Sequence, residues 1–388
     1  MLIYIHVPFC RSKCRYCAFY SEVPAPGVFE TYTEALLREI DLRGEALGSR
    51  PVETIFFGGG TPSLLPVPLL GCILEALASR FSFALPATRE AEGLEISLEA
   101  NPESLAVTGR AVELRALGIT RLSIGAQSFD DARLRLIGRP HTAAGAEKAV
   151  RAAQQAGFGN IGLDLIRGLP GSGRLAAHTR ASWLRELRQA VSLAPQHISA
   201  YCLTLEPGTP LADAADTLRF PAEAAQAAMY HEGAAFLESE GFPQYEVSNF
   251  ARPGFICRHN HGYWRGVDYL GLGPGAVSTL DGIRQTNPPD FALWRAACLN
   301  GDALGETEVL PHETLALERL MLGLRTVEGV DLPAWEALSG RSFAATYGGL
   351  AHALEAAGLV RVSADRLAPT RQGLAVADAI VERFVEDR

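Results

Sequence analysis

Three cysteines near the start of the chain have the spacing to share one metal centre. Cys10, Cys14 and Cys17 form the pattern C-x3-C-x2-C, directly after a strand-like run at residues 2–7. An iron–sulfur cubane usually takes four thiolates, and the residue two positions after Cys17 is Phe19. One iron is therefore left open, and an open coordination position is a place for chemistry or for a small ligand. The spacing suggests that S-adenosylmethionine chelates this iron.

Two other uses of these thiols are a disulfide pair with a spare thiol and an incomplete zinc site. The odd number of cysteines, seven, and the lack of a basic leader disfavour a disulfide. A structural zinc site needs a second pair at short spacing, whereas the remaining cysteines are scattered singly. Thiols placed for an iron–sulfur cluster imply a reducing compartment, so we expect a cytoplasmic protein.

Length and composition limit the possible partners. With 388 residues, of which 48% are hydrophobic and 20% charged, the chain can bury a large core in one big domain with a smaller appendage. No apolar run approaches the roughly 18 residues that span a bilayer, so we expect no transmembrane segment. The net charge of −9 disfavours a phosphate-binding surface, and we expect no nucleic-acid partner.

Predicted strands and helices alternate through the first half of the chain. After the strand at 2–7, strands are expected at 53–57, 94–98, 121–125, 160–166 and 197–203. Helices are expected between them at 30–47, 67–80, 104–117, 143–157 and 181–193. Six βα units imply an α/β fold with a parallel sheet, and this number favours a partial (βα)6 barrel. The periodicity alone also allows a doubly wound open sheet.

Unusual residues just past the strands favour the barrel, because barrels place their chemistry at the carboxyl ends of strands. The second strand runs into Gly58, Gly59 and Gly60, which allow positive φ and let a ligand approach the bare backbone. Thr61 and Pro62 then have the residue types of an N-cap and first helical position. A flexible turn is the simpler explanation of the glycines alone.

Three polar side chains extend this pattern to the next strands. Glu99 ends the third strand, where a carboxylate can accept hydrogen bonds from ribose hydroxyls, and Gln127 ends the fourth. Asp164 interrupts an otherwise apolar fifth strand. A carboxylate there costs desolvation energy unless it is paired or bound, so Asp164 is a stronger functional candidate than Glu99.

Several short motifs, in the same order and over nearly the whole chain, resemble the radical S-adenosylmethionine superfamily. The specific likeness is to the branch with the oxygen-independent coproporphyrinogen III oxidase and the heme chaperone HemW. The matching segments are 4–10, 14–17, 57–62, 97–99, 123–129, 164–170 and 271–276. The resemblance implies a [4Fe-4S] cluster on the three cysteines and bound S-adenosylmethionine. It places at cofactor-contact positions Tyr4, Tyr16, Gly59, Gly60, Thr61, Glu99, Gln127, Arg139 and Asp164, with Thr204 and Val277 as further backbone contacts.

Within this branch the sequence is more similar to the chaperone than to the oxidase. The oxidase has a fourth cysteine where this chain has Phe19, and a long segment before its first strand, whereas here only three residues precede Tyr4. Residues 259–264, HNHGYW, resemble the HNxxYW signature of the chaperone family. The implied function is to bind heme and deliver it to an acceptor protein that the sequence does not identify. The oxidase, and a radical enzyme acting on another substrate, remain alternatives.

His259 is the candidate heme residue, because neutral imidazole is a common axial ligand of heme iron. A histidine in a loop rich in glycine and aromatic residues is, however, more often a hydrogen-bonding residue than a metal ligand. Arg258 and Arg265 have the chemistry to meet heme propionates, although ordinary surface charge explains them equally well. Cys257 is expected to be a buried free thiol. No residue is assigned a catalytic role.

The expected domains are a core barrel at 1–205, an extension with the heme-binding loop at 206–305, and a C-terminal domain at 306–388. The last part has helical stretches at 312–324, 332–338 and 343–357, two short strands at 359–362 and 366–369, and a final helix. This order resembles a winged helix, an α+β unit that often binds DNA. Its eight arginines and no lysine against thirteen acidic residues, a net charge of −5, disfavour DNA and favour packing against protein.

Overall fold

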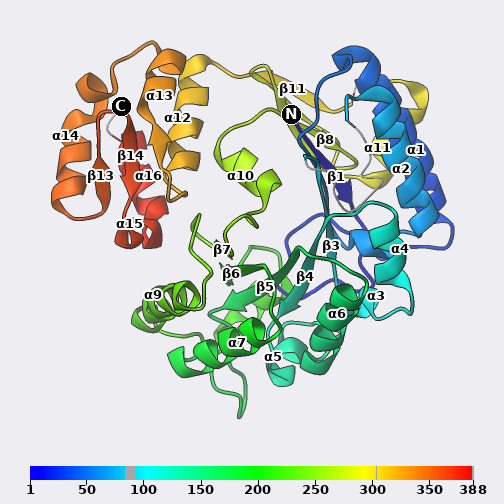
Figure 1. Ribbon diagram of the computed structural model, residues 1–388, viewed down its shortest axis with the longest axis horizontal. Coiled ribbons are helices and arrows are strands. Elements are labelled where there is room, and N and C mark those ends of the chain that lie inside the picture. Colours follow the sequence, from blue (N-terminus) through cyan, green and yellow to red (C-terminus); the bar gives the residue numbers. More distant parts are fainter. Residues whose placement is uncertain (84–92, 303, 387–388) are drawn as a thin grey trace.

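One sheet of 11 strands runs through the larger part of the protein. The computed structural model describes residues 1–83, 93–302 and 304–386, and its sheet has the strand order β11-β10-β9-β8-β1-β2-β3-β4-β5-β6-β7 (Figure 1). The central parallel strands are β1 (Leu2–Val7), β2 (Thr54–Gly59), β3 (Glu95–Ala100), β4 (Arg121–Gln127), β5 (Ile161–Arg167) and β6 (His197–Cys202). A doubly wound sheet would reverse its strand order, but these six follow one another in sequence. The partial (βα)6 barrel is confirmed.

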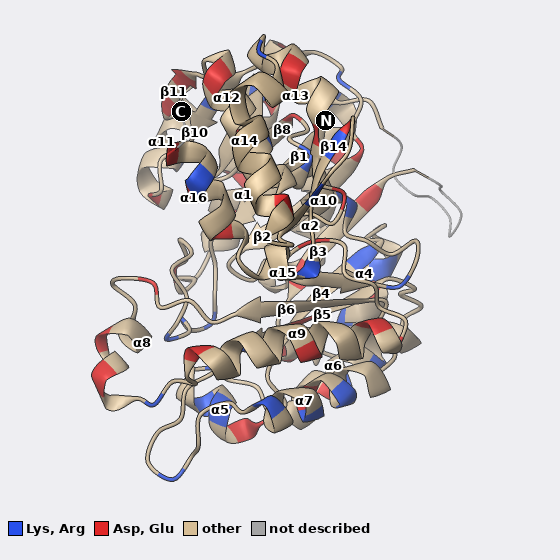
Figure 2. Cartoon of the chain, turned by 90° about the vertical axis from the view of Figure 1, so that its left-hand side faces the viewer, with Lys and Arg blue, Asp and Glu red and all other residues tan. Residues whose placement is uncertain are grey.

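Helices cover the outer face of these strands (Figure 2). They are α1 (Val28–Leu47), α2 (Val67–Arg80), α3 (Pro102–Leu105), α4 (Arg110–Ala116), α5 (Asp131–Leu136), α6 (Ala143–Gln155), α7 (Arg180–Ser192) and α9 (Glu223–Ser239). Alternate strand residues such as Ile3, Ile5, Leu98 and Leu163 form the core beneath them. The helix expected at 104–117 is divided in two: α3 ends at Leu105, and Gly109, with φ 82°, precedes the first residue of α4.

The inner face of the same strands is polar. Between the buried apolar positions lie buried Thr54, Glu95, Ser97, Arg121, Ser123, His197 and Ser199. Most small barrels fill this space with branched apolar residues. A polar interior is stable only where its groups find hydrogen bonds, so these side chains need partners within the protein or on a bound ligand.

The strands after β6 complete the sheet at both edges. β7 (Asn249–Ala251) pairs antiparallel with β6, and β8 (Tyr269–Leu272) pairs parallel with β1. β9 (Val277–Leu280), β10 (Ile283–Thr286) and β11 (Glu306–Val309) continue antiparallel from β8. The connections contain two 3-10 turns, η1 (Pro62–Leu64) and η2 (Ala215–Thr217), and helices α8 (Pro210–Asp213), α10 (Arg258–Trp264) and α11 (Phe291–Asn300).

The remaining elements pack around a second core, here called the C-terminal domain, residues 310–386. Helices α12 (His312–Gly323), α13 (Leu332–Ser339), α14 (Phe343–Ala356), α15 (Arg371–Ala375) and α16 (Ala377–Glu386) surround a sheet of β12 (Val330–Asp331), β14 (Arg366–Pro369) and β13 (Val360–Val362). Trp335, Phe343, Tyr347 and Phe384 are central to its core. Because β11 belongs to the large sheet, this unit starts after the residue 306 expected from the sequence. Among the described helices, none is long and apolar enough to cross a membrane.

Candidate functional site

A cavity of about 660 Å³ lies at the carboxyl ends of the barrel strands. It is lined by Cys10, Cys14, Cys17, Tyr16, Gly59, Gly60, Thr61, Glu99, Gln127, Arg139, Asp164 and Thr204, all of them candidates from the sequence. These residues come from several strand ends and from the loops that follow them. The structure therefore brings most of the expected site residues together in one place.

The loop with the three cysteines is held at two points by backbone hydrogen bonds. Cys10 N donates to Glu22 O at 2.9 Å, and Arg15 N donates to Ile137 O at 3.0 Å. All seven cysteines of the chain are free, so the disulfide alternative is not supported. Burial raises the pKa of the Cys10 and Cys17 thiols. A metal that binds here must therefore displace protons from the thiols.

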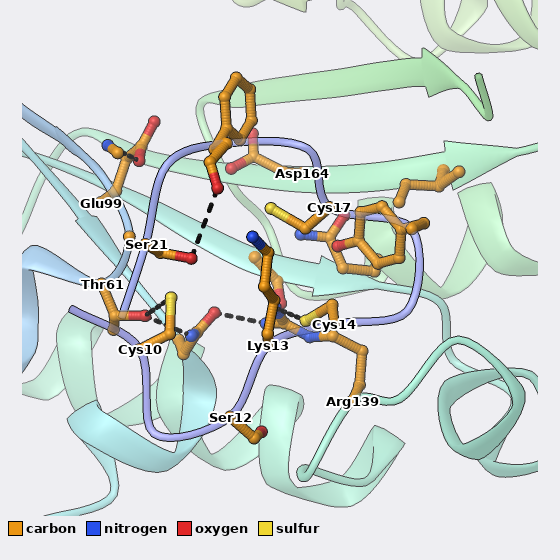
Figure 3. A pocket seen from close by; sticks show the side chains of 18 of the residues that line it. Cys10, Ser12, Lys13, Cys14, Cys17, Ser21, Thr61, Glu99, Arg139 and Asp164 are labelled. Carbon is orange, nitrogen blue, oxygen red and sulfur yellow. Dashed lines mark hydrogen bonds between the residues drawn. The ribbon is translucent and has the colours of Figure 1, made fainter. Parts of the chain in front are cut away.

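The three thiols line the same cavity. Within the described residues, no group of three His, Cys, Asp or Glu closes on one metal ion. A cubane bonds each cysteine to a different iron, so its ligands stand apart around the cluster. Two of the three thiols also receive side-chain hydrogen bonds: Thr61 Oγ1 donates to Cys10 Sγ and Arg139 Nη1 to Cys14 Sγ, each at 3.5 Å (Figure 3). Such donors suit anionic sulfur.

The glycines at the end of β2 let the cysteine loop approach the strand. Gly60 N donates to Val7 O at 2.8 Å and Thr61 N to Phe9 O at 2.7 Å. A Cβ on Gly60 would lie 2.7 Å from Phe9 N, and Gly59 adopts the expected positive φ, 103°. The absence of side chains at Gly59 and Gly60 thus lets residues 7–9 pack closely against the end of β2, and both glycines also line the cavity. Thr61 precedes η1 as expected, but its side chain makes no cap.

Two carboxylates, Glu99 of β3 and Asp164 of β5, face the cavity. Glu99 accepts a hydrogen bond from Gly59 N at 3.2 Å, and both oxygens of Asp164 accept from Ser123 Oγ at 3.1 to 3.2 Å. Burial, with repulsion from Asp164 second, raises the pKa of Glu99 to about 8. Burial also raises the pKa of Asp164. A ligand that brings positive charge or hydroxyl donors would relieve this cost.

Gln127 reaches the cavity through an irregular strand end. The pairing of β4 with β5 is interrupted between Gly125 and Gln127 by a bulge, and Gln127 has φ 63°, in the left-handed region. A bulge re-aims the side chain at the end of a strand, and a non-glycine residue with positive φ is held there by its surroundings. Both features agree with a binding role for this strand end.

Asn101 is a site residue that the sequence analysis missed. Its Nδ2 donates to Thr61 Oγ1 at 2.8 Å, and its Oδ1 accepts from Arg139 Nη2. It also lines the cavity, as do Lys13, Ser123 and Tyr201. Asn101 lies two residues after Glu99 at the same strand end, so the rule that selected Glu99 would have found it.

Three expected residues lie outside the set that lines the cavity. Tyr4 is enclosed in the barrel, where its hydroxyl lies 3.1 Å from His6 Nδ1. Val277 begins β9, opposite Thr286 of β10. The third is His259. All three were selected by resemblance to family motifs, which fix a position along the chain but not its surroundings in this fold.

His259 is completely buried at the opposite end of the barrel. Its Nδ1 lies 2.7 Å from Thr54 Oγ1, its Nε2 lies 3.1 Å from the Tyr263 hydroxyl, and its ring stacks on Phe56. Burial lowers its pKa to about 3, so the ring is neutral. Thr54 and Glu95 are the first residues of β2 and β3, and Glu95 accepts from the backbone N of Arg258 and His259. Helix α10 therefore closes the amino-terminal end of the barrel.

The neighbours of His259 share this structural setting. Cys257 is fully buried and free, as expected, and burial raises the pKa of its thiol to about 12. Arg258 Nη1 donates to Gly93 O at 2.6 Å. His261 lies 3.5 Å from Glu328, which follows α12 in the C-terminal domain. This segment therefore contacts both the barrel and the C-terminal domain.

Comparisons with known proteins agree with this geometry. The Radical SAM superfamily profile matches residues 4–174, and the HemN C-terminal domain profile matches residues 310–376. The chain is 40% identical to the heme chaperone HemW of Synechocystis, over 84% of this chain and 78% of that protein. It is 33% identical to HemW of Haemophilus influenzae, over 99% and 98% respectively.

Two further relatives extend the comparison. The mitochondrial radical S-adenosyl methionine domain-containing protein 1 of Bos taurus is 38% identical, over 86% of this chain and 75% of that protein. The solved structure of coproporphyrinogen III oxidase (HemN) from Escherichia coli has the same fold, with a TM-score of 0.83, 24% identity, and coverage of 99% of this chain and 89% of that one. The chain therefore belongs to the radical SAM superfamily and, within it, to the family of the heme chaperone HemW.

Proposed function

We propose that this protein is a cytoplasmic heme chaperone that binds a [4Fe-4S] cluster, S-adenosylmethionine and heme, and transfers the heme to an acceptor protein. The observation that carries the proposal is the cavity, which has three thiols on its wall and Phe19 where a fourth cysteine would complete the set. Relatives that carry the name heme chaperone, at 33 to 40% identity, support the heme part.

The residues of the cavity divide by chemistry. Cys10, Cys14 and Cys17 supply thiolates to the cluster, which when bound offers one iron with an open position to S-adenosylmethionine. Glu99 and Asp164 supply carboxylate oxygens for the hydroxyl and ammonium groups of that ligand. Tyr16, Gly59, Gly60, Gln127 and Thr204 complete the wall of its binding site.

Heme binding through His259 requires a rearrangement. Both ring nitrogens have hydrogen-bond partners and the side chain is inaccessible, so His259 can reach heme iron only when α10 leaves the end of the barrel. We propose that heme association of His259 and displacement of α10 are one event.

Anaerobic reconstitution followed by heme titration tests the function. The reconstituted protein is expected to contain iron and acid-labile sulfide, to develop a Soret band with added heme, and to lose that band to an apo acceptor. Replacement of all three cysteines by serine should remove the iron and sulfide. Turnover of coproporphyrinogen III, with methionine and 5′-deoxyadenosine released, would instead show an oxidase and contradict the chaperone proposal.

The role of His259 is tested in the same titration. His259→Ala is expected to shift the Soret band and weaken heme uptake. Cys72→Ser, at an exposed thiol in α2, is expected to leave both unchanged. An unchanged Soret band in a His259→Ala protein that still folds would remove His259 from the heme site. The cluster and the remainder of the proposal would stand.

A further inference from the structure

We propose that Asn101 is a positioning residue that directs two hydrogen bonds onto the cluster ligands Cys10 and Cys14 and thereby sets the reduction potential of the cluster. The inference rests on the proposed function, because it requires a cluster on these cysteines. It goes further by assigning a role to Asn101, which lines the cavity and is not one of the cysteines proposed to hold the cluster.

A continuous path of hydrogen bonds joins two of the three thiols. Thr61 Oγ1 donates to Cys10 Sγ at 3.5 Å, and Asn101 Nδ2 donates to that same Oγ1 at 2.8 Å. On its other side Asn101 Oδ1 accepts from Arg139 Nη2, and Arg139 Nη1 donates to Cys14 Sγ at 3.5 Å. The amide of Asn101 is the centre of this path, with a sulfur at each end.

Which group donates in each hydrogen bond follows from the chemistry of the side chains. A guanidinium only donates, so the amide oxygen of Asn101 must face Arg139 and its NH2 group must face Thr61. Because the Thr61 oxygen then accepts from the amide, its own proton is free to point at Cys10. An acceptor in place of the NH2 group would draw that proton away from the sulfur.

Most groups along this path are buried, while Asn101 and Cys10 are half-buried at the cavity wall. The exposed fractions of Thr61, Arg139 and Cys14 are 2%, 8% and 9%. Arg139 is held from a second side, since its Nη2 also donates to Gly125 O at 2.8 Å. Hydrogen bonds in such a place are stronger than in water and are costly to leave unmade.

Hydrogen bonds to the sulfur ligands are one of the means by which a protein tunes an iron–sulfur cluster. They withdraw charge from the thiolate and stabilise the reduced, more negative cluster. Loss of one such bond should therefore move the midpoint potential to a more negative value without removing a ligand.

The test is a pair of nearly isosteric variants on reconstituted protein. Asn101→Asp keeps an oxygen for Arg139 but turns the Thr61 hydroxyl towards the new carboxylate, and Thr61→Val removes the hydroxyl. Both are expected to retain iron and sulfide and to show a more negative midpoint potential in a redox titration followed by EPR. The effect of the charge that Asn101→Asp adds is separated by making the same substitution in the Thr61→Val background, where a smaller shift is expected.

Ser63→Ala is the matched control, because Ser63 Oγ lies 2.6 Å from Ser104 Oγ in the same buried region but reaches no sulfur. It should lower the unfolding midpoint in urea and leave the potential unchanged. Equal shifts from Asn101→Asp in both backgrounds, or no shift in either variant, would overturn the role of Asn101. Absence of iron and sulfide from the unaltered protein would instead overturn the proposed function.

Discussion

Asp164 shows how one side chain can mark a binding site on an otherwise apolar strand. Its two oxygens accept from Ser123 and face the cavity. We predict that Asp164→Asn weakens S-adenosylmethionine binding roughly 10- to 100-fold, since a hydrogen bond to a charged group contributes about 1.5 to 3 kcal/mol. Equilibrium dialysis of the reconstituted protein measures this. Asp281→Asn, at an exposed carboxylate paired with Arg50, is the control, and an equal loss there would contradict the prediction.

Glu99 makes the stability of the ligand-free protein depend on pH. Its pKa is raised to about 8, by burial first and by Asp164 second, from 4.5 in an unperturbed chain. Between these values the folded protein keeps a proton that the unfolded chain has lost, so the free energy of unfolding falls as the pH rises. Glu99→Gln should remove this fall. Urea unfolding at several pH values checks it, and a pH-independent difference between variant and parent would refute it.

The position of polar residues at strand ends located several residues of the site, because strand ends in a barrel meet at one edge. Glu99, Gln127 and Asp164 follow from that rule, and the same rule would have given Asn101. Arg139 has no such signal, since it lies in a loop after α5 and reaches Cys14 only through the tertiary fold. His259 was found from its motif, but burial of its ring depends on where α10 packs, which a motif does not specify.

At the scale of elements, the end of β2 is the support of the cysteine loop. We predict that Gly60→Ala causes loss of iron from reconstituted protein, because the new Cβ would meet Phe9 N and O at 2.7 Å and push the loop from the strand. Iron and sulfide per chain are the measurement. Gly159→Ala, where the Cβ would meet nothing within 4 Å, is the matched control and should retain full iron. Full iron in Gly60→Ala would refute this explanation.

Helix α14 contains a glycine whose replacement by alanine should increase the stability of the protein. Gly349 lies mid-helix, with nothing within 4 Å of an added Cβ, so Gly349→Ala should stabilise the protein by about 0.5 to 1 kcal/mol. Gly323→Ala in α12 should destabilise it, because the Cβ would lie 2.8 Å from Val330 Cγ2. Urea unfolding of both variants measures whether each substitution raises or lowers the free energy of unfolding. Two shifts of the same sign would contradict the packing argument.

Helices and central strands could be predicted because their periodicity is local. The helix expected at 67–80 coincides with α2, and the strand expected at 366–369 coincides with β14. The antiparallel pair of β10 and β11 was missed, since Glu306–Val309 is exposed along its whole length and has no apolar alternation. Exposed antiparallel edge strands leave little signal in the sequence.

For the molecule as a whole, the barrel and the C-terminal domain are joined partly by an ion pair. Arg284 of β10 makes two contacts of 2.8 Å with Glu318 of α12, and both side chains are about a quarter exposed. A double-mutant cycle with Arg284→Ala and Glu318→Ala should give a coupling of about 0.5 to 1 kcal/mol in the unfolding of the C-terminal domain. Additive effects of the two substitutions would show that the pair contributes nothing to attachment.

The order of the first six strands could be inferred from the sequence, but the closing pairings could not. β8 lies beside β1 although Tyr269 and Leu2 are far apart along the chain. No periodicity within either segment encodes such a pairing, which arises from the path of the whole chain. The same holds for the choice between barrel and doubly wound sheet, which periodicity left open and strand order resolves.

Residues 245–247 run alongside residues 325–327: Val247 N donates to Arg325 O at 2.9 Å, Val327 N donates to Tyr245 O at 3.1 Å, and Glu246 faces Thr326 between them. The Tyr245 hydroxyl in turn lies 2.8 Å from His197 Nε2 inside the barrel. The start of the α12–α13 connection is thus joined, through two peptide groups and the Tyr245 phenol, to the His197 imidazole at the beginning of β6.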